Sequence, residues 1–255
     1  MDYLKNLQAS NPLIHCITNT VTVNDCANAL LAIGARPVMA EHPAETAEIT
    51  ARADALLINM GSVTASKIEA MKNSVLSAKE KNLPLVLDCV GISSSTLRHE
   101  TVLDLLKIYT PRIIKGNASE IAALCTGKMS NGGVDADGKA DAVAAEELAK
   151  RTGAVIAVTG AEDIITDGAR TAHVKNGSRL LSKVTGTGCM LGCIMAALIT
   201  TADAYDAAKY GAAVMGICGE TAAENYRGMG TFHARLMDAV SLVTDADIEA
   251  KIKAD

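Results

Sequence analysis

Short apolar runs alternate with longer amphipathic segments along the first two thirds of the chain. The runs are rich in Val, Ile and Leu, as in strands buried on both faces of a parallel sheet. They read PVMA from residue 37, ALLINMG from 55, PLVLDCV from 84, RIIKGN from 112 and VIAVTG from 155. Between them the pattern predicts helices of crossover length over about 22–33, 44–52, 64–81, 96–109, 118–125 and 139–152. The alternation indicates an α/β protein.

The rest of the chain departs from this alternation. Asn176-Gly177 stands between two short runs in TAHVKNGSRLL, and Asn-Gly favours the type I′ turn, so a β-hairpin is predicted there at one edge of the sheet. From Thr187 onward the sequence is Ala-rich and almost wholly helical, with breaks near Thr201, Gly228 and Thr244. No linker, low-complexity tract or repeat divides the chain. We therefore expect one three-layer α/β/α domain over residues 1–255, with a mainly parallel sheet and a helical C-terminal third.

Composition narrows the classes of function. Only 2% of the residues are aromatic although 49% are apolar, so tightly packed, Ala-rich helices are expected. A net charge of -5 argues against a surface for nucleic-acid phosphates, and we expect no nucleic-acid partner. Seven cysteines without paired spacing indicate reduced thiols in a cytoplasmic protein. No signal pattern opens the chain and no apolar run is long enough to cross a bilayer, so we expect no membrane partner.

Small and acidic residues follow the predicted strands. In parallel α/β sheets, ligands collect where the strands end, and these residue types suit a phosphate and its cation. Gly and Asn also serve turn geometry, so either interpretation fits any single position. The residues concerned are Asn59, Gly61, Asp88, Gly91, Gly116, Asn117, Glu120, Thr159 and Gly160.

The stretch VTGTGCMLG carries the most specific chemistry. Gly186 and Gly188 allow the backbone to approach a ligand, and a helix that begins near Thr187 presents amide N–H groups without intrahelical partners. Such a turn binds anions and would stabilise a phosphoryl group in transfer. Cys189 lies in this first turn, where the pKa of a thiol is normally lowered, and could accept the proton of an attacking hydroxyl. The alternative is a buried cysteine that only packs.

Other readings of these residues have less support. No P-loop string occurs, and Gly192 comes one residue too late for a dinucleotide fingerprint. Cys189 and Cys193 share a helical face, but no second pair completes a zinc site. A cysteine nucleophile with a histidine base stays open, although no hydrolase signature supports it. The candidate bases are His15, His42, His99, His173 and His233.

Three blocks resemble one known family. NPLIHCITNTVTVNDCANALLAIGARPVMA, GNASEIAAL and VTGTGCMLG, in this order and at these intervals, are similar to the hydroxyethylthiazole kinase family of thiamine salvage, a branch of the ribokinase-like fold. The similarity covers nearly the whole chain. It implies ATP-dependent phosphorylation of the primary alcohol of 4-methyl-5-(2-hydroxyethyl)thiazole, with magnesium. It also implies a homotrimer with substrate pockets between neighbouring subunits.

The resemblance also assigns the binding residues. It places Met39, in RPVMAEH, against the thiazole ring and Gly186 near the substrate. Lys115 and Thr159 match nucleotide-binding positions, and we expect Asn117 and Gly188 to complete the nucleotide site. Relatives have Arg where this chain has Lys115, so the charge is kept but a bidentate phosphate contact is lost.

The metal and catalytic positions follow in the same way. Glu120 matches the acidic position that organises magnesium through water, with Asp88 as its companion. Cys89 stands where the family commonly has Pro, which bears on the loop after Asp88. Cys189 occupies the position of the catalytic Asp of most ribokinase-like enzymes. Because a loose phosphoryl-transfer transition state needs little base, its contribution is expected to be modest.

The N-terminal block and the alternative functions complete the expectations. Thr18, Asn19, Thr20 and Asn24 cluster at a strand-to-helix turn, where they could cap the helix or line a pocket; we assign Asn24 to the substrate pocket. A sugar or pyrimidine kinase of the same fold would share the anion site but not the HCITNTVTVND block. A non-catalytic thiazole or thiamine carrier would need no magnesium site.

Overall fold

A single eight-stranded sheet organises the chain. The computed structural model describes residues 2–127 and 138–255, and the strand order across its sheet is β2-β1-β3-β4-β5-β6-β7-β8. The six strands from β2 to β6 pair in parallel, whereas β6, β7 and β8 pair antiparallel. The strands are β1 (Leu13–Ile17), β2 (Arg36–Val38), β3 (Ala55–Asn59), β4 (Leu85–Asp88), β5 (Ile113–Asn117), β6 (Val155–Thr159), β7 (Asp163–Thr166) and β8 (Thr171–Val174). The mainly parallel sheet with one mixed edge is therefore confirmed.

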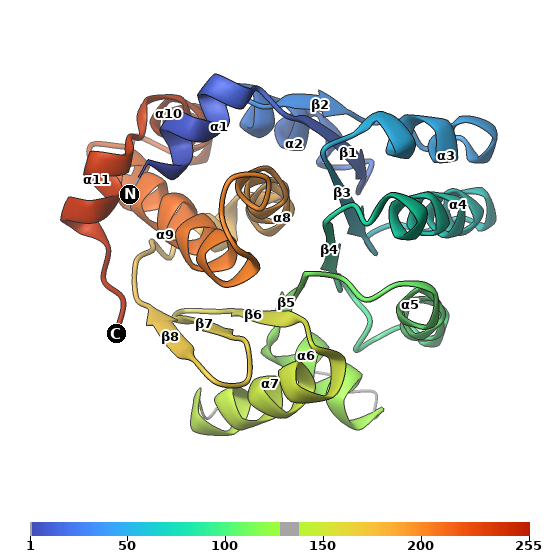
Figure 1. Cartoon of the computed structure of the whole chain (residues 1–255). Helices are drawn as coiled ribbons and strands as arrows, with labels where there is room; N and C mark the ends of the chain where they lie inside the picture. Colours follow the sequence, from blue (N-terminus) through green and yellow to red (C-terminus); the bar gives the residue numbers. More distant parts are fainter. Residues whose placement is uncertain (1, 128–137) are drawn as a thin grey trace.

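Helices cover both faces of this sheet, as the predicted three-layer architecture requires (Figure 1). On one face lie α3 (Pro43–Arg52), α4 (Ala65–Lys81), α5 (Thr96–Ile108), α6 (Ala118–Thr126) and α7 (Gly138–Thr152). On the other face lie α1 (Tyr3–Ser10), α2 (Val23–Ala32), α8 (Thr187–Leu198), α9 (Ala204–Ala223), α10 (Met229–Leu242) and α11 (Asp245–Lys251). Within the described residues, the predicted helices and the predicted C-terminal breaks agree with these bounds to within a few residues.

The strands separate two apolar cores. In β3, Ala55 and Leu57 join the core under α2, α8 and α9, while Leu56 and Ile58 join the core under α4 and α5. Successive side chains of a strand point to opposite faces, so a strand buried on both faces must be apolar throughout. This explains why the runs in the sequence are continuous rather than alternating. Pro37 lies in β2, an edge strand, where a missing N–H costs no ladder hydrogen bond.

The predicted hairpin exists, but its position was wrong. The turn joins β7 to β8 at residues 167–170, where Asp167 Oδ1 accepts hydrogen bonds from the amides of Ala169 and Arg170 at 2.9 and 2.7 Å. Asn176 instead follows β8, is 5% exposed, and accepts from the Lys253 amide at 2.7 Å. Its side chain fastens the C-terminal segment to the sheet edge, so a tertiary contact overrides the local turn preference of Asn-Gly.

Helix α8 is buried along nearly its whole length beside the sheet. Residues 189–198 are all buried, and the helix packs against α2, α9, β3 and β4. A helix that is apolar on all sides is stable only inside a core. Its first turn opens at the edge where β3, β4 and β5 end. No helix in the described part of the chain is long and apolar enough to cross a membrane.

Candidate functional site

Polar side chains meet where three neighbouring parallel strands end. Asn59 ends β3, Asp88 ends β4 and Lys115 lies in β5, and register places Asn59 opposite Asp88 and Asp88 opposite Lys115. Lys115 Nζ lies 3.0 Å from Asp88 Oδ1, and Asn59 Nδ2 donates to Asp88 Oδ2 at 2.9 Å. All three side chains are buried. The buried carboxylate thus has a partner on each oxygen, as burial of a charge requires.

Cys189 lies directly above this cluster in the first turn of α8. Asn59 Nδ2 approaches Cys189 Sγ at 3.3 Å, so one amide group bridges the thiol and Asp88. The expected lowering of the thiol pKa was wrong. Burial raises the pKa of Cys189, and the nearby Asp88 carboxylate raises it further. These two effects outweigh the helix terminus, so Cys189 is present mainly as a thiol.

The backbone before Cys189 forms the expected glycine turn at the start of a helix. Gly186 is the N-cap of α8 with φ 94°, and no side chain caps the helix there. A Cβ on Gly186 would lie 2.7 Å from Thr22 Cγ2, so the α2 entry loop packs against this glycine. A Cβ on Gly188 would lie 3.7 Å from Lys115 Nζ. The first amides of α8 and the Lys115 ammonium group therefore face the same small region.

Glu120 and Asn117 organise the neighbouring loop at the end of β5. They form a capping box at the start of α6, in which Glu120 Oε2 accepts from the Asn117 amide at 2.8 Å. Glu120 Oε1 accepts from the Gly91 amide at 2.7 Å. Cys89 and Gly91 belong to the loop after β4, where Cys89 is fully buried and its carbonyl accepts from the Ile92 amide at 3.2 Å. Burial raises the pKa of Glu120 against the effect of its two amide partners.

A cavity of about 560 Å³ adjoins the opening of α8. Its size falls in the range of pockets for small ligands. Thr159 and Gly188 line it, as expected of nucleotide-binding residues, whereas Lys115 and Asn117 lie outside its lining. The remaining polar lining comes from Asp163, Asn176, Ser178, Arg179, Ser182 and Thr187.

The two other expected substrate residues lie apart from each other. Met39 follows β2, is half-buried, and packs against the core on the α2 and α8 side. Asn24 lies in the first turn of α2, is exposed, and accepts a hydrogen bond from Asn28 Nδ2 at 3.0 Å. The structure brings Met39 toward the α8 face but does not join Asn24 to the buried polar cluster.

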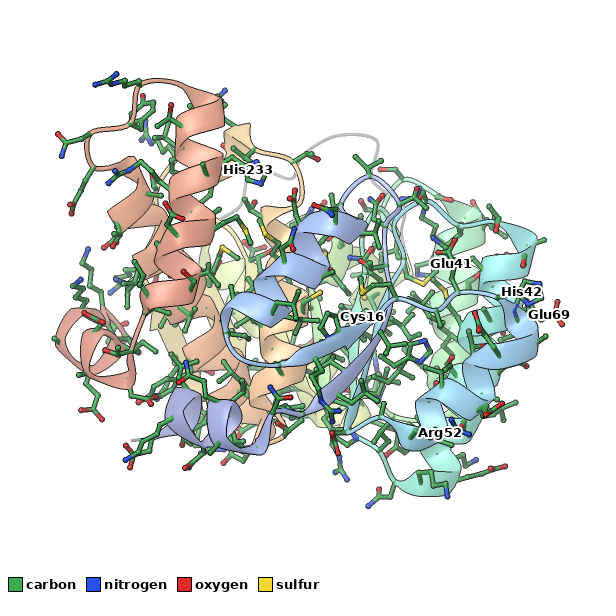
Figure 2. The ribbon with its side chains drawn as sticks, turned by 90° about the horizontal axis from the view of Figure 1, so that it is seen from above. Cys16, Glu41, His42, Arg52, Glu69 and His233 are labelled. Atoms are coloured by element: carbon green, nitrogen blue, oxygen red, sulfur yellow. The ribbon has the colours of Figure 1, made fainter. Side chains whose placement is uncertain are left out.

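No histidine contacts Cys189 in the described part of the chain, which removes the support for a cysteine–histidine pair. His15 contacts Thr50 and Ala40, His42 caps α3, and His99 contacts Ala123. His173 and His233 pair with the carboxylates of other residues. Figure 2 shows His42 and His233 on opposite sides of the molecule.

Three residues near the site were missed by the sequence analysis. Lys67 is a buried cation in the first turn of α4, and Asp163 is an acid in the cavity lining. His15 was considered only as a base, yet it is fully buried and bonded to the backbone after Met39. Of these three, only Lys67 could have been noticed in the sequence. A basic residue at the start of a predicted helix opposes the helix dipole, so such a position needs another explanation.

Comparisons with known proteins show the family of the chain. The model of the hydroxyethylthiazole kinase family matches residues 4–246. Hydroxyethylthiazole kinase 2 of Clostridium botulinum is 39% identical over 263 residues, covering 99% of this chain and 98% of the relative. Hydroxyethylthiazole kinase 1 of Methanosphaera stadtmanae is 40% identical, covering 97% and 93%.

A solved structure extends the agreement to the fold. The hydroxyethylthiazole kinase protein of Pyrococcus horikoshii superposes with a TM-score of 0.93 at 34% identity, covering 99% of this chain and 96% of that one. The ribokinase-like fold implied by the sequence blocks is thereby confirmed. Since the sequence similarity and the shared fold both run through nearly the whole chain, the protein belongs to the hydroxyethylthiazole kinase family.

Proposed function

We propose that this protein transfers the terminal phosphoryl group of ATP to the primary hydroxyl of 4-methyl-5-(2-hydroxyethyl)thiazole, in thiamine salvage. One observation carries the proposal. The uncapped amides at the start of α8, the Lys115 ammonium group and the Cys189 thiol converge beside a cavity of about 560 Å³. Backbone amides and a fixed cation stabilise the charge of a transferring phosphoryl group, and this stabilisation is the main catalytic contribution in such reactions.

Each residue then has a specific task. Met39 contacts the thiazole ring, and Gly186 with Asn24 borders the alcohol. Thr159, Asn117, Gly188 and Lys115 bind the nucleotide. The thiolate form of Cys189 accepts the hydroxyl proton as the new oxygen–phosphorus bond forms and the bond to ADP breaks. Because the pKa of Cys189 is raised, its thiol form predominates near neutral pH, and its contribution as a base is modest.

The acidic residues fit a magnesium ion. Asp88 and Glu120 offer two carboxylates near the anion-binding turn, and each influences the pKa of neighbouring groups by its charge. No cluster of three His, Cys, Asp or Glu that could hold a metal occurs among the described residues. Mg²⁺ in kinases is held by one or two carboxylates, water and the substrate phosphates, so the donor set matches. Bound there, Mg²⁺ would supply charge neutralisation on the phosphates.

We also propose that the protein is a cytoplasmic homotrimer. Val21, Leu31 and Leu242 are 70%, 58% and 74% exposed. They lie beside or within α2 and α10, which pack against each other, and Val21 belongs to the loop that borders Gly186. Exposed apolar side chains on these two neighbouring helices and the adjoining loop support subunit contacts near the substrate site. Sedimentation velocity would give the mass of the assembly, and a monomer at micromolar concentration would refute the trimer.

A coupled assay of ADP release tests the proposed reaction. We expect release with hydroxyethylthiazole and ATP that depends on added magnesium and is weaker with sugars or pyrimidines of similar size. A sugar or pyrimidine substrate that outperforms the thiazole alcohol would assign the protein to another kinase activity. A carrier would release no ADP, and its melting temperature would not rise with ATP and magnesium.

A further inference from the structure

Lys67 is a buried cation that has no role in the proposed phosphoryl transfer. It is 3% exposed and occupies the third position of α4. A lysine is almost never buried unless it is paired. A positive charge in the first turn also opposes the helix dipole, so this position does not serve the stability of α4 itself. The partners of the ammonium group must explain its place.

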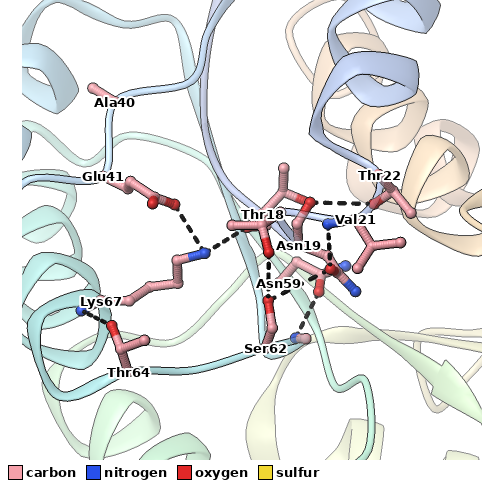
Figure 3. A network of polar contacts seen from close by, with 12 residues as sticks. Thr18, Asn19, Val21, Thr22, Ala40, Glu41, Asn59, Ser62, Thr64 and Lys67 are labelled. Carbon is pink, nitrogen blue, oxygen red and sulfur yellow. Dashed lines mark hydrogen bonds and ion pairs between the residues drawn. The ribbon is translucent and has the colours of Figure 1, made fainter.

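The ammonium group joins two loops that come from different strands. Lys67 Nζ donates to the Thr18 carbonyl at 2.9 Å and pairs with Glu41 Oε2 at 2.8 Å. Thr18 follows β1 and opens the loop that leads to α2, whereas Glu41 lies in the loop between β2 and α3. Figure 3 shows the lysine reaching between the two loops from the start of α4. One side chain thus fixes the separation of two segments.

Both segments adjoin residues assigned to the substrate. Met39 lies two residues before Glu41, and Thr22, which packs against Gly186, lies four residues after Thr18. Hydrogen bonds continue the connection toward the reacting groups. Thr20 contacts Ser62, which lies near Asn59 in Figure 3. Asn59 Nδ2 in turn contacts Asp88 and Cys189.

A second buried side chain fastens the segment after Met39. His15 Nε2 lies 2.9 Å from the Ala40 carbonyl and His15 Nδ1 lies 2.8 Å from Thr50 Oγ1. Because a carbonyl only accepts, Nε2 carries the hydrogen. Burial lowers the pKa of His15, so the neutral ring holds this contact. Ala40 and Glu41 are therefore both bonded to buried side chains, which restricts the position of the neighbouring Met39.

We propose that Lys67 is a positioning residue for the thiazole alcohol, acting through Glu41 and the Thr18 carbonyl on the two loops that adjoin Met39 and Gly186. This inference rests on the proposed function. Lys67 touches neither the nucleotide cavity nor the groups that transfer the phosphoryl group. Its removal should therefore weaken binding of the alcohol and leave binding of ATP unchanged.

The test compares Lys67→Met and Glu41→Gln with Lys72→Met. Lys72 lies on the same helix and pairs with Asp104 at 3.6 Å, but its side chain is 42% exposed and lies outside the network. KM for each substrate and kcat are measured, and the affinity for the alcohol alone is measured by calorimetry. We expect Lys67→Met to raise KM and Kd for the alcohol by about tenfold, as small displacements in binding sites do. KM for ATP should stay within about twofold, as should all constants of Lys72→Met.

Glu41→Gln keeps the test valid if Lys67→Met does not fold. The Glu41 side chain is 48% exposed, and glutamine keeps an oxygen that can accept a hydrogen bond from the Lys67 ammonium group, so a smaller rise in KM for the alcohol alone is expected. A folded Lys67→Met protein with unchanged alcohol affinity, or with equal losses for alcohol and ATP, would overturn the proposal. A parent protein that phosphorylates no thiazole alcohol would instead refute the proposed function, and the positioning role with it.

Discussion

The ammonium group of Lys115 lies 3.0 Å from the Asp88 carboxylate, and both side chains are buried at adjoining strand ends. Burial acts against the charge of Lys115, but the charge and hydrogen bond of Asp88 outweigh it and raise the pKa of Lys115. The lysine is therefore charged at any physiological pH. The folded chain by itself therefore places a cation beside the first turn of α8.

Removal of the lysine should destabilise the protein. In Lys115→Met, the Asp88 carboxylate stays buried and loses its counter-ion, and we expect the free energy of unfolding to fall by about 3–5 kcal/mol. Urea denaturation followed by circular dichroism measures the change. Lys107→Met is the control, because Lys107 also lies 3.0 Å from a carboxylate, that of Asp104, but its side chain is 75% exposed. That variant should lose less than about 1 kcal/mol.

A second substitution tests the reason for this loss. Asp88→Asn combined with Lys115→Met removes the uncompensated charge, so the double variant should be more stable than Lys115→Met alone, while remaining inactive. If the double variant is no more stable, the loss comes from packing and not from charge.

Cys189 can be tested by substitution and pH. We expect Cys189→Ala to lose roughly 10- to 10⁴-fold in turnover, the range of general-base contributions. Cys189→Asp supplies an ionised base and should retain or exceed the parent turnover. Because burial and Asp88 raise the pKa of the thiol, parent turnover should increase toward alkaline pH, and this slope should disappear in Cys189→Asp. Cys125→Ser, at a half-buried cysteine in α6, serves as the control. An alanine variant with full activity would reduce Cys189 to a packing residue.

Asp163 should make stability depend on pH. Burial raises the pKa of Asp163 to about 6, although its carboxylate accepts from the Gly160 amide at 2.9 Å. Between pH 4 and 6 the folded state keeps a proton that the unfolded chain has released, so stability falls as pH rises through this window. Asp163→Asn should remove this dependence and add at most about 3 kcal/mol at pH 7. Denaturation midpoints at pH 4, 5, 6 and 7 measure it, and identical slopes in both proteins would contradict it.

Gly186 tests the packing of the anion-binding turn. Gly186→Ala places a side chain in the left-handed region and 2.7 Å from Thr22 Cγ2, and each of the two effects costs about 1–3 kcal/mol. Thr22→Ser removes that methyl group, so the double variant should recover the steric part only. Gly153→Ala, at φ 75° with nothing within 4 Å of its Cβ, isolates the backbone part. If the double variant loses as much unfolding free energy as the two single variants together, the Thr22 methyl group must move aside for the new side chain at position 186.

The sequence also predicted where most site residues come together, for a definite reason. Asp88, Asn117, Glu120 and Thr159 all follow or end strands of one parallel sheet, so the alternation of elements alone places them at one edge. Lys115, in the middle of β5, was expected only from the family resemblance. The glycines before Cys189 likewise identify the start of a helix. These inferences depend on local sequence pattern and on the common direction of parallel strands, which places their carboxyl ends at one edge of the sheet.

Interactions between distant residues were beyond the reach of such patterns. The Asn176-Gly177 pair favours a hairpin turn locally, but in the folded chain Asn176 instead contacts Lys253. Cys189 looked like an activated thiol at a helix terminus, yet burial and a carboxylate 101 positions away in the sequence raise its pKa. Lys67 gave no sign that Thr18 and Glu41 would surround it.

The sequence by itself thus determined most of the elements, their layering and the edge that holds the chemistry, because side-chain periodicity decides which faces are buried. Only the tertiary structure decided the charge states and the couplings at that edge. Desolvation and ion pairing depend on which atoms lie within a few ångströms, and in this protein those atoms come from strands and loops far apart along the chain.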